Sequence, residues 1–80
     1  MTRRDFLRYN DQPCRFRMKS GKVVFGVIWE QETASGFQYC FASLQERFGP
    51  PKNGSGMGMN ISLEEIIAAE LLPLADVLAG

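Results

Sequence analysis

A stretch of alternating polarity near the start of the chain constrains the fold more than any other feature. Apolar and basic residues take turns there: Cys14, Arg15, Phe16, Arg17, Met18 and Lys19. Because successive side chains of a β-strand point to opposite faces of the sheet, this period of two predicts a strand with one buried face. Ser20 and Gly21 follow, and glycine accepts the positive φ of a tight hairpin turn. The stretch therefore predicts the first half of a β-hairpin.

The second strand of this hairpin is predicted over residues 23–29, which are apolar at almost every position. A β-branched and aromatic run without alternation is typical of a central strand whose two faces are both covered. Gly26 interrupts the run and has no side chain to pack. We expect Gly26 to allow a bend or bulge, as small barrels need where one strand serves two parts of the sheet.

A third strand is predicted over residues 37–43, with Phe37, Tyr39 and Phe41 on one face, after a polar connection over residues 30–36. Residues 2–9 predict a short helix before the first strand, because Thr2 and Asp5 have the spacing of a weak capping box. Pro13 would end that helix. Residues 14–48 thus carry the first three strands.

The remainder of the chain is less regular. Residues 49–58 are rich in Gly and Pro and predict a flexible surface loop, and residues 73–80 predict a tail. Residues 59–72 allow two interpretations. Helical spacing and a capping box at Ser62 and Glu65 favour a helix over 62–72, which would make an α+β fold. Two strands joined by one helical turn fit the same residues.

The first hairpin resembles the first motif of Sm-like proteins. The resemblance rests on a turn glycine at Gly21, a second glycine five positions on at Gly26, and alternating apolar residues at Val24 and Ile28. Glu32 lies near the position where the family has an acidic residue. The resemblance implies a mostly β fold, a small five-stranded SH3-like barrel with a short N-terminal helix in one domain. It also favours the turn and strand for residues 59–72.

The residues with which Sm-like proteins bind RNA are absent. The family has an Asn shortly after the acidic residue, whereas residues 33–36 are Thr-Ala-Ser-Gly, and no Arg-Gly or Lys-Gly pair precedes the last strand. The resemblance therefore implies an architecture and no RNA site, because a shared fold does not by itself define a function.

Catalytic chemistry has little support in this composition. The 80 residues contain no His, which is the commonest general base and metal ligand. Cys14 and Cys40 lack CxxC spacing and are expected to be buried, reduced side chains. We expect no enzyme activity, no cofactor and no metal. No stretch is long and apolar enough to cross a membrane, and the start of the chain lacks the pattern of a signal peptide, so the expected location is cytoplasmic.

Charge is divided unevenly along the chain, although the net charge is zero. Seven of the nine basic residues lie within residues 1–22, and seven of the nine acids lie beyond them. The outward row of the hairpin is the candidate site: Arg15, Arg17, Lys19 and Lys22. Such a row could follow a phosphate backbone, with Tyr39 and Trp29 as stacking surfaces. The same charges also protect a sheet edge from unwanted pairing.

The preferred interpretation is a non-catalytic binding or assembly module that associates with a protein partner or with itself. A basic and an acidic half could join neighbouring copies. The alternative is nucleic-acid binding through the basic strand face.

Overall fold

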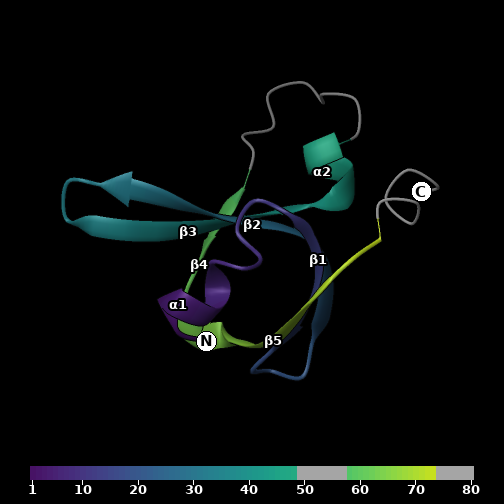
Figure 1. Cartoon of the computed structure of the whole chain (residues 1–80). Helices are drawn as coiled ribbons and strands as arrows, with labels where there is room; N and C mark the ends of the chain where they lie inside the picture. Colours follow the sequence, from purple (N-terminus) through teal and green to yellow (C-terminus); the bar gives the residue numbers. More distant parts are fainter. Residues whose placement is uncertain (49–57, 74–80) are drawn as a thin grey trace.

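Five antiparallel strands form one sheet in the order β4-β3-β2-β1-β5 in the computed structural model, which describes residues 1–48 and 58–73 (Figure 1). The strands are β1 (Pro13–Met18), β2 (Val23–Thr33), β3 (Gly36–Ser43), β4 (Met59–Ile61) and β5 (Ile66–Leu71). Two short helices, α1 (Arg3–Phe6) and α2 (Leu44–Phe48), and a 3₁₀ turn, η1 (Leu63–Glu65), complete the described elements. The fold is mostly β, as the sequence predicts.

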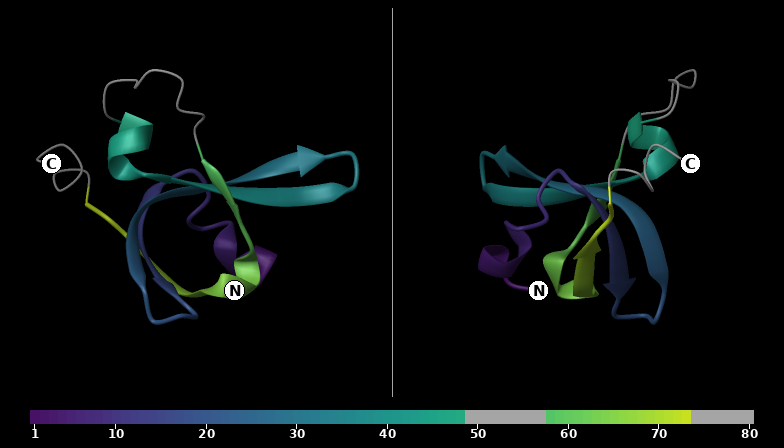
Figure 2. Two further views of the ribbon diagram at one scale, coloured as in Figure 1. Left: turned by 180° about the vertical axis from the view of Figure 1, so that it is seen from behind. Right: turned by 45° about the vertical axis from the view of Figure 1, so that its right-hand side comes forward.

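The long strand β2 joins the two parts of the sheet. Its first half pairs with β1 and its second half pairs with β3, and Gly26 lies opposite both Cys14 and Ser43. The strands curl around an interior, and α1 lies at one open side of the curl (Figures 1 and 2). The sheet does not close into the predicted barrel. Strands β4 and β5 end the strand order, and within the described residues no pairing joins them.

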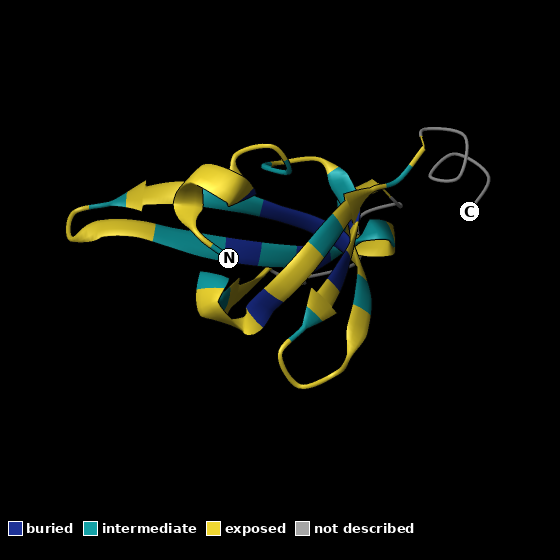
Figure 3. Ribbon diagram, turned by 60° about the horizontal axis from the view of Figure 1, so that its bottom comes forward, coloured by how far each residue is buried: buried dark blue, intermediate teal, exposed yellow. Residues whose placement is uncertain are grey.

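The core fills the inside of this curl and confirms the alternation in the first strand. Its fully buried members are Phe6, Cys14, Phe16, Ile28 and Ile66. They come from α1, β1, β2 and β5. Buried positions lie in β1, in the middle of β2, in the second half of β3 and at the start of β5, whereas the turns and the far end of the β2–β3 hairpin are exposed (Figure 3).

The space around Gly26 explains why a glycine stands there. A Cβ atom at this position would lie 2.2 Å from the backbone oxygen of Ala42 and 2.7 Å from the Phe41 ring. Strand β3 therefore approaches β2 more closely than any other residue would allow. The predicted cover on both faces of β2 is only partly present: Val27 is fully buried, but Val23 and Phe25 on the outer face are 38% and 49% exposed.

Strand β2 continues further than predicted. The segment expected to be a connection, residues 30–36, instead pairs with β3 as far as Thr33 opposite Gly36. A side-chain hydrogen bond from Gln38 Nε2 to Gln31 Oε1, 3.1 Å long, joins the two strands on this segment. Cross-strand contacts of this kind stabilise a hairpin that composition alone would class as loop.

The predicted N-terminal helix over residues 2–9 is shorter in the structure. Thr2 caps it by accepting a hydrogen bond from the Asp5 amide, as the capping pattern predicts, but the helix ends at Phe6. A bond from Tyr9 N to Phe6 O, 2.7 Å long, turns the chain toward β1. The structure also has a second short helix, α2, at the end of residues 14–48, where only strands were predicted.

The helical alternative for residues 62–72 does not hold. Ser62 caps only the single turn η1, and residues from Ile66 onward form β5 along β1. The amide of Lys19 donates to the carbonyl of Glu65 at 2.7 Å where the two segments meet. Backbone pairing with a distant strand thus overrides the local helical propensity. The predicted loop over 49–58 lies outside the described residues except for Gly58, and the tail except for Pro73.

Candidate functional site

The predicted basic row lies where the alternation places it. Arg15 and Arg17 point outward from β1, and Lys19 and Lys22 lie exposed at the turn between β1 and β2. Arg15 faces Glu70 of β5 at 3.9 Å, and both side chains are largely exposed. Because exposed ion pairs contribute little, this contact leaves the guanidinium open to other partners.

Sequence reasoning missed the apolar side chains that stand beside the row. In the β1–β2 register, Phe25 lies opposite Arg15 and Val23 lies opposite Arg17, all on the outer face of the sheet. Phe25 is 49% exposed. Pairing the two predicted strands across the turn at Ser20 and Gly21 would have revealed this neighbourhood. The outer face is therefore a mixed basic and aromatic surface.

The two aromatic residues proposed as stacking surfaces lie elsewhere. Tyr39 projects from the opposite face of the sheet, where its ring meets Phe6 edge to face with centroids 5.2 Å apart. Its hydroxyl donates to Glu30 Oε2 at 3.0 Å. Burial and this hydrogen bond to Glu30 raise the pKa of Tyr39. Trp29 does lie on the outer face, but beside α2 and away from the row.

Glu30 is the centre of a polar contact between α1 and the β2–β3 hairpin. Arg3 donates to both of its carboxylate oxygens, at 2.8 and 3.0 Å, in the bidentate geometry that gives strong ion pairs. The hydrogen bond from Arg3 lowers the pKa of Glu30. The Arg3 guanidinium also lies 4.6 Å from the centre of the Phe37 ring. These groups are occupied in holding α1 in place.

Among the described residues, the outer edge of β5 is covered only at its start, where the Met1 amino group donates to the Ile66 carbonyl at 3.0 Å. Leu72 N donates to Pro13 O, so alternation along the strand directs the backbone groups of Glu70 and Ala68 toward β1 and those of Ala69 and Leu71 outward. Within the described residues no strand accepts them. The edge is aliphatic, and Ile67 and Leu71 are 58% and 48% exposed.

A groove of about 290 Å³ runs between this edge and the N-terminal segment. Its lining residues are Met1, Asp5, Arg8, Tyr9, Ile67, Ala68 and Ala69. The floor is therefore the β5 edge itself, and α1 and the turn after it form the wall. A strand added to β5 would have side chains facing this wall.

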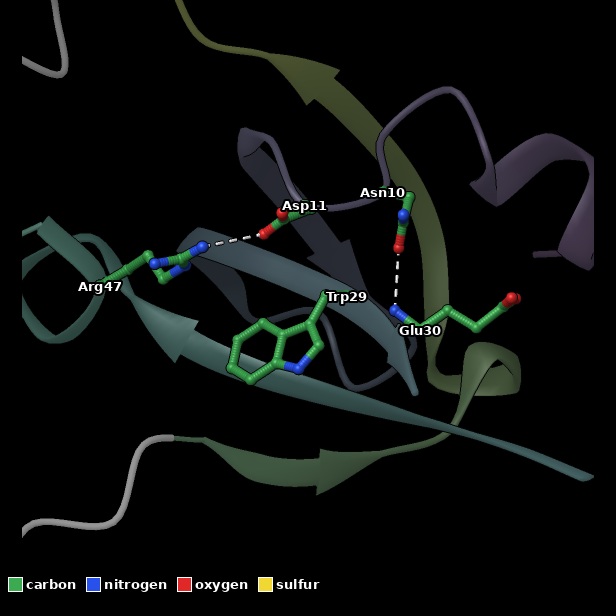
Figure 4. A pocket seen from close by; sticks show the side chains of 5 residues that line it. All are labelled: Asn10, Asp11, Trp29, Glu30 and Arg47. Atoms are coloured by element: carbon green, nitrogen blue, oxygen red, sulfur yellow. Dashed lines mark hydrogen bonds and ion pairs between the residues drawn. The ribbon is translucent and has the colours of Figure 1, made fainter. Parts of the chain in front are cut away.

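A second hollow, of about 350 Å³, lies around Trp29 and is lined by Asn10, Asp11, Trp29, Glu30 and Arg47 (Figure 4). Arg47 of α2 pairs with Asp11 at 3.2 Å, and Asn10 Oδ1 accepts the amide of Glu30 at 2.8 Å. The indole ring lies between these two contacts, and the Glu30 side chain points away from it (Figure 4).

Both cysteines are free and buried, as predicted. Burial raises the pKa of the Cys14 thiol to about 11, so this thiol stays protonated and unreactive at neutral pH. Within the part of the chain that the structure describes, no three His, Cys, Asp or Glu side chains come together to hold a metal ion. None of the helices in the same part is long and apolar enough to cross a membrane.

Comparisons of this chain with family models, with curated proteins and with solved structures find no match.

Proposed function

We propose that this protein is a non-catalytic assembly module of SH3-like (Sm-like) architecture, whose copies join through the outer edges of their sheets. The strand order supports the architecture, since a long bent β2 is shared by two halves of the sheet and one 3₁₀ turn joins β4 to β5. The short helix α1 before the first strand agrees with it. The open edge of β5 carries the functional part of the proposal.

Most proteins protect an exposed strand edge with Lys, Pro, a bulge or a covering segment. Strand β5 has neither Lys nor Pro along Ile66–Leu71, and Glu70 is its one charged residue. Its bulge lies at Ile67, the extra residue between the pairs Arg17–Ala68 and Met18–Ile66, before the open groups of Ala69 and Leu71. These four outward backbone groups form a template for another strand. An aliphatic edge of this kind is costly unless a partner covers it.

The occupant that we propose is β4 of a second copy. Strand β4 ends the sheet on the opposite side, and its Met59 is 66% exposed, which supplies an apolar side chain for the groove beside α1. Pairing β4 of one copy with β5 of the next is a head-to-tail contact. Such contacts repeat until a ring closes or a filament grows.

The Ile67→Lys variant tests this proposal. We expect the unmodified protein to be an oligomer in light scattering coupled to gel filtration, and Ile67→Lys to be a monomer, because a lysine on a strand edge opposes pairing. The fold should survive, since Ile67 is already 58% exposed. Ala34→Lys, at the far hairpin turn, adds the same charge and should remain oligomeric. A strictly monomeric unmodified protein at all concentrations would contradict the proposal.

A second candidate function is supported by the outer face. There Phe25 of β2 lies opposite Arg15 of β1, and single-strand binders combine such an aromatic platform with basic side chains that track the phosphates. Nucleic-acid binding through Arg15, Arg17, Lys19 and Lys22 therefore remains a proposal, with Phe25 in place of Tyr39 as the stacking group.

The Arg15→Glu/Arg17→Glu double variant tests this second function. We expect it to weaken binding to a short single-stranded RNA by about a hundredfold and to flatten the salt dependence, because two phosphate contacts are lost. Phe25→Ala should weaken binding by about tenfold with an unchanged salt slope, as expected for lost stacking. Arg4→Glu, on α1, is the control. Affinity that is the same in all variants would exclude this surface.

A further inference from the structure

The hollow around Trp29 belongs neither to the β5 edge nor to the basic row. We propose that it binds a small planar aromatic anion, whose ring lies on the Trp29 indole and whose carboxylate or phosphate pairs with Arg47. The proposal is independent of the assembly described above. It rests on the position of the indole, on an excess of unpaired N–H donors and on the size of the hollow.

The indole is held in place before any ligand arrives. Trp29 lies on β2 opposite Cys40 of β3, so its backbone is paired within the centre of the sheet. The far end of the ring packs against Gly58, where an added Cβ would lie 3.1 Å from Trp29 Cη2. Trp29 is partly buried, and the remainder of its ring faces the hollow (Figure 4). A fixed aromatic surface of this kind binds another ring without a large cost in side-chain entropy.

Several N–H donors around the ring have no partner within the described residues. Asn10 Oδ1 is occupied by the amide of Glu30, which leaves the Asn10 NH₂ group available. The Trp29 indole N–H makes no hydrogen bond within the described residues. Arg47 uses one of its five N–H groups on Asp11. A ligand that supplies acceptors, and above all a negative charge, matches these donors.

The carboxylates of Glu30 and Asp11 lie near the hollow, and they repel the negative charge of a ligand to different extents. The Glu30 carboxylate is engaged by Arg3 and Tyr39 and points away from the indole (Figure 4). Asp11 pairs with Arg47 at 3.2 Å, but the two side chains are 52% and 36% exposed. A pair this exposed is weak, so Arg47 can turn toward a ligand at little cost.

The volume limits the size of the ligand. About 350 Å³ is at the lower end of the range for small-molecule pockets, which begins near 300 Å³. One or two fused rings with a single acidic group would fill the space. A larger ligand would extend beyond the indole and lose its contacts.

The single tryptophan makes a direct experiment possible, because a ¹⁵N-labelled sample gives one indole N–H resonance. Full-length protein is titrated with 2-naphthoate, with its neutral amide and with cyclohexanecarboxylate. We expect 2-naphthoate to shift the indole resonance saturably, and the neutral amide and the non-aromatic acid to bind at least about tenfold more weakly. Adenosine 5′-monophosphate tests whether a phosphate replaces the carboxylate. Equal affinity for the amide and the acid would overturn the proposal.

Two variants should have opposite effects. Arg47→Gln should weaken 2-naphthoate about tenfold, because the charge-assisted contact is lost. Asp11→Asn should tighten it about threefold, since Arg47 is freed and the negative charge is removed. Asn also tolerates the φ of 57° at this position. Arg4→Gln is the control for lost positive charge. The same affinity in Arg47→Gln and Asp11→Asn, with the backbone spectrum unchanged, would rule out the site.

Discussion

Gly26→Ala is expected to destabilise this protein by at least about 3 kcal/mol, near the upper limit for overpacking a core. The added Cβ would lie 2.2 Å from Ala42 O, which is backbone, so relief requires β2 and β3 to separate. These strands share the longest pairing in the sheet. In thermal unfolding followed by circular dichroism, the midpoint should fall by more than about 12 °C, given 4–8 °C per kcal/mol in a domain of this size.

Gly21→Ala is the matched control, because it makes the same chemical change at a turn. An added Cβ there meets nothing within 4 Å, so the only cost is the positive φ of 92°. That cost is about 1 kcal/mol. If Gly26→Ala were no more destabilising than Gly21→Ala, the close approach of the two strands would not exist.

Phe6→Ala is expected to lower the free energy of unfolding by about 3–5 kcal/mol, as for other fully buried aromatic side chains. Phe6 comes from the four-residue helix α1, yet it is 0% exposed and packs edge to face on Tyr39. A helix this short has no stability of its own, so its position depends on this anchor and on the Arg3–Glu30 pair. Urea unfolding with fluorescence of Trp29 as the probe gives the value.

Leu7→Ala is the control for Phe6→Ala. Leu7 is the next residue and is 46% exposed, so its truncation should cost less than about 1 kcal/mol. Similar losses in the two variants would mean that α1 does not close the core. Loss of oligomerisation in Phe6→Ala, with the fold retained, would in turn connect α1 to the groove beside β5.

The assembly and the outer face are compatible in geometry. Adding a strand at β5 extends the sheet sideways and leaves its outer face uncovered. The rows that contain Arg15, Arg17 and Phe25 would therefore lie on one continuous surface from copy to copy. If both proposals hold, the oligomer should bind long single strands more tightly than short ones, because linked sites raise the effective concentration. The Ile67→Lys monomer should lose this advantage for long strands and bind short strands as the oligomer does.

Much of the fold could be predicted from local pattern. The alternation around Phe16 predicted a strand with a buried and a basic face, and the structure confirms both faces. Thr2 was predicted to cap a helix and does so. The two cysteines were expected to be buried and are. Each of these inferences uses neighbours within a few residues, where periodicity and capping chemistry act directly.

The missed features all depend on residues distant in sequence. Local pattern favours a helix for residues 66–71, and only the resemblance predicted the strand that they form with β1, near the start of the chain. Residues 30–33 are polar and continue β2 because β3 pairs with them. The stacking role assigned to Tyr39 failed because the sheet places its hydroxyl on Glu30.

The sequence by itself determined which faces of the first hairpin are apolar and which are charged, since side-chain period follows directly from backbone geometry. It also determined that this stretch of 80 residues offers no imidazole as a general base or metal ligand. Only the tertiary structure decided which strand ends the sheet, which aromatic stands beside the arginines, and that Trp29, Asn10 and Arg47 share one hollow. The physical reason is that edges and hollows are made by pairing between distant segments, and local propensity does not specify those pairings.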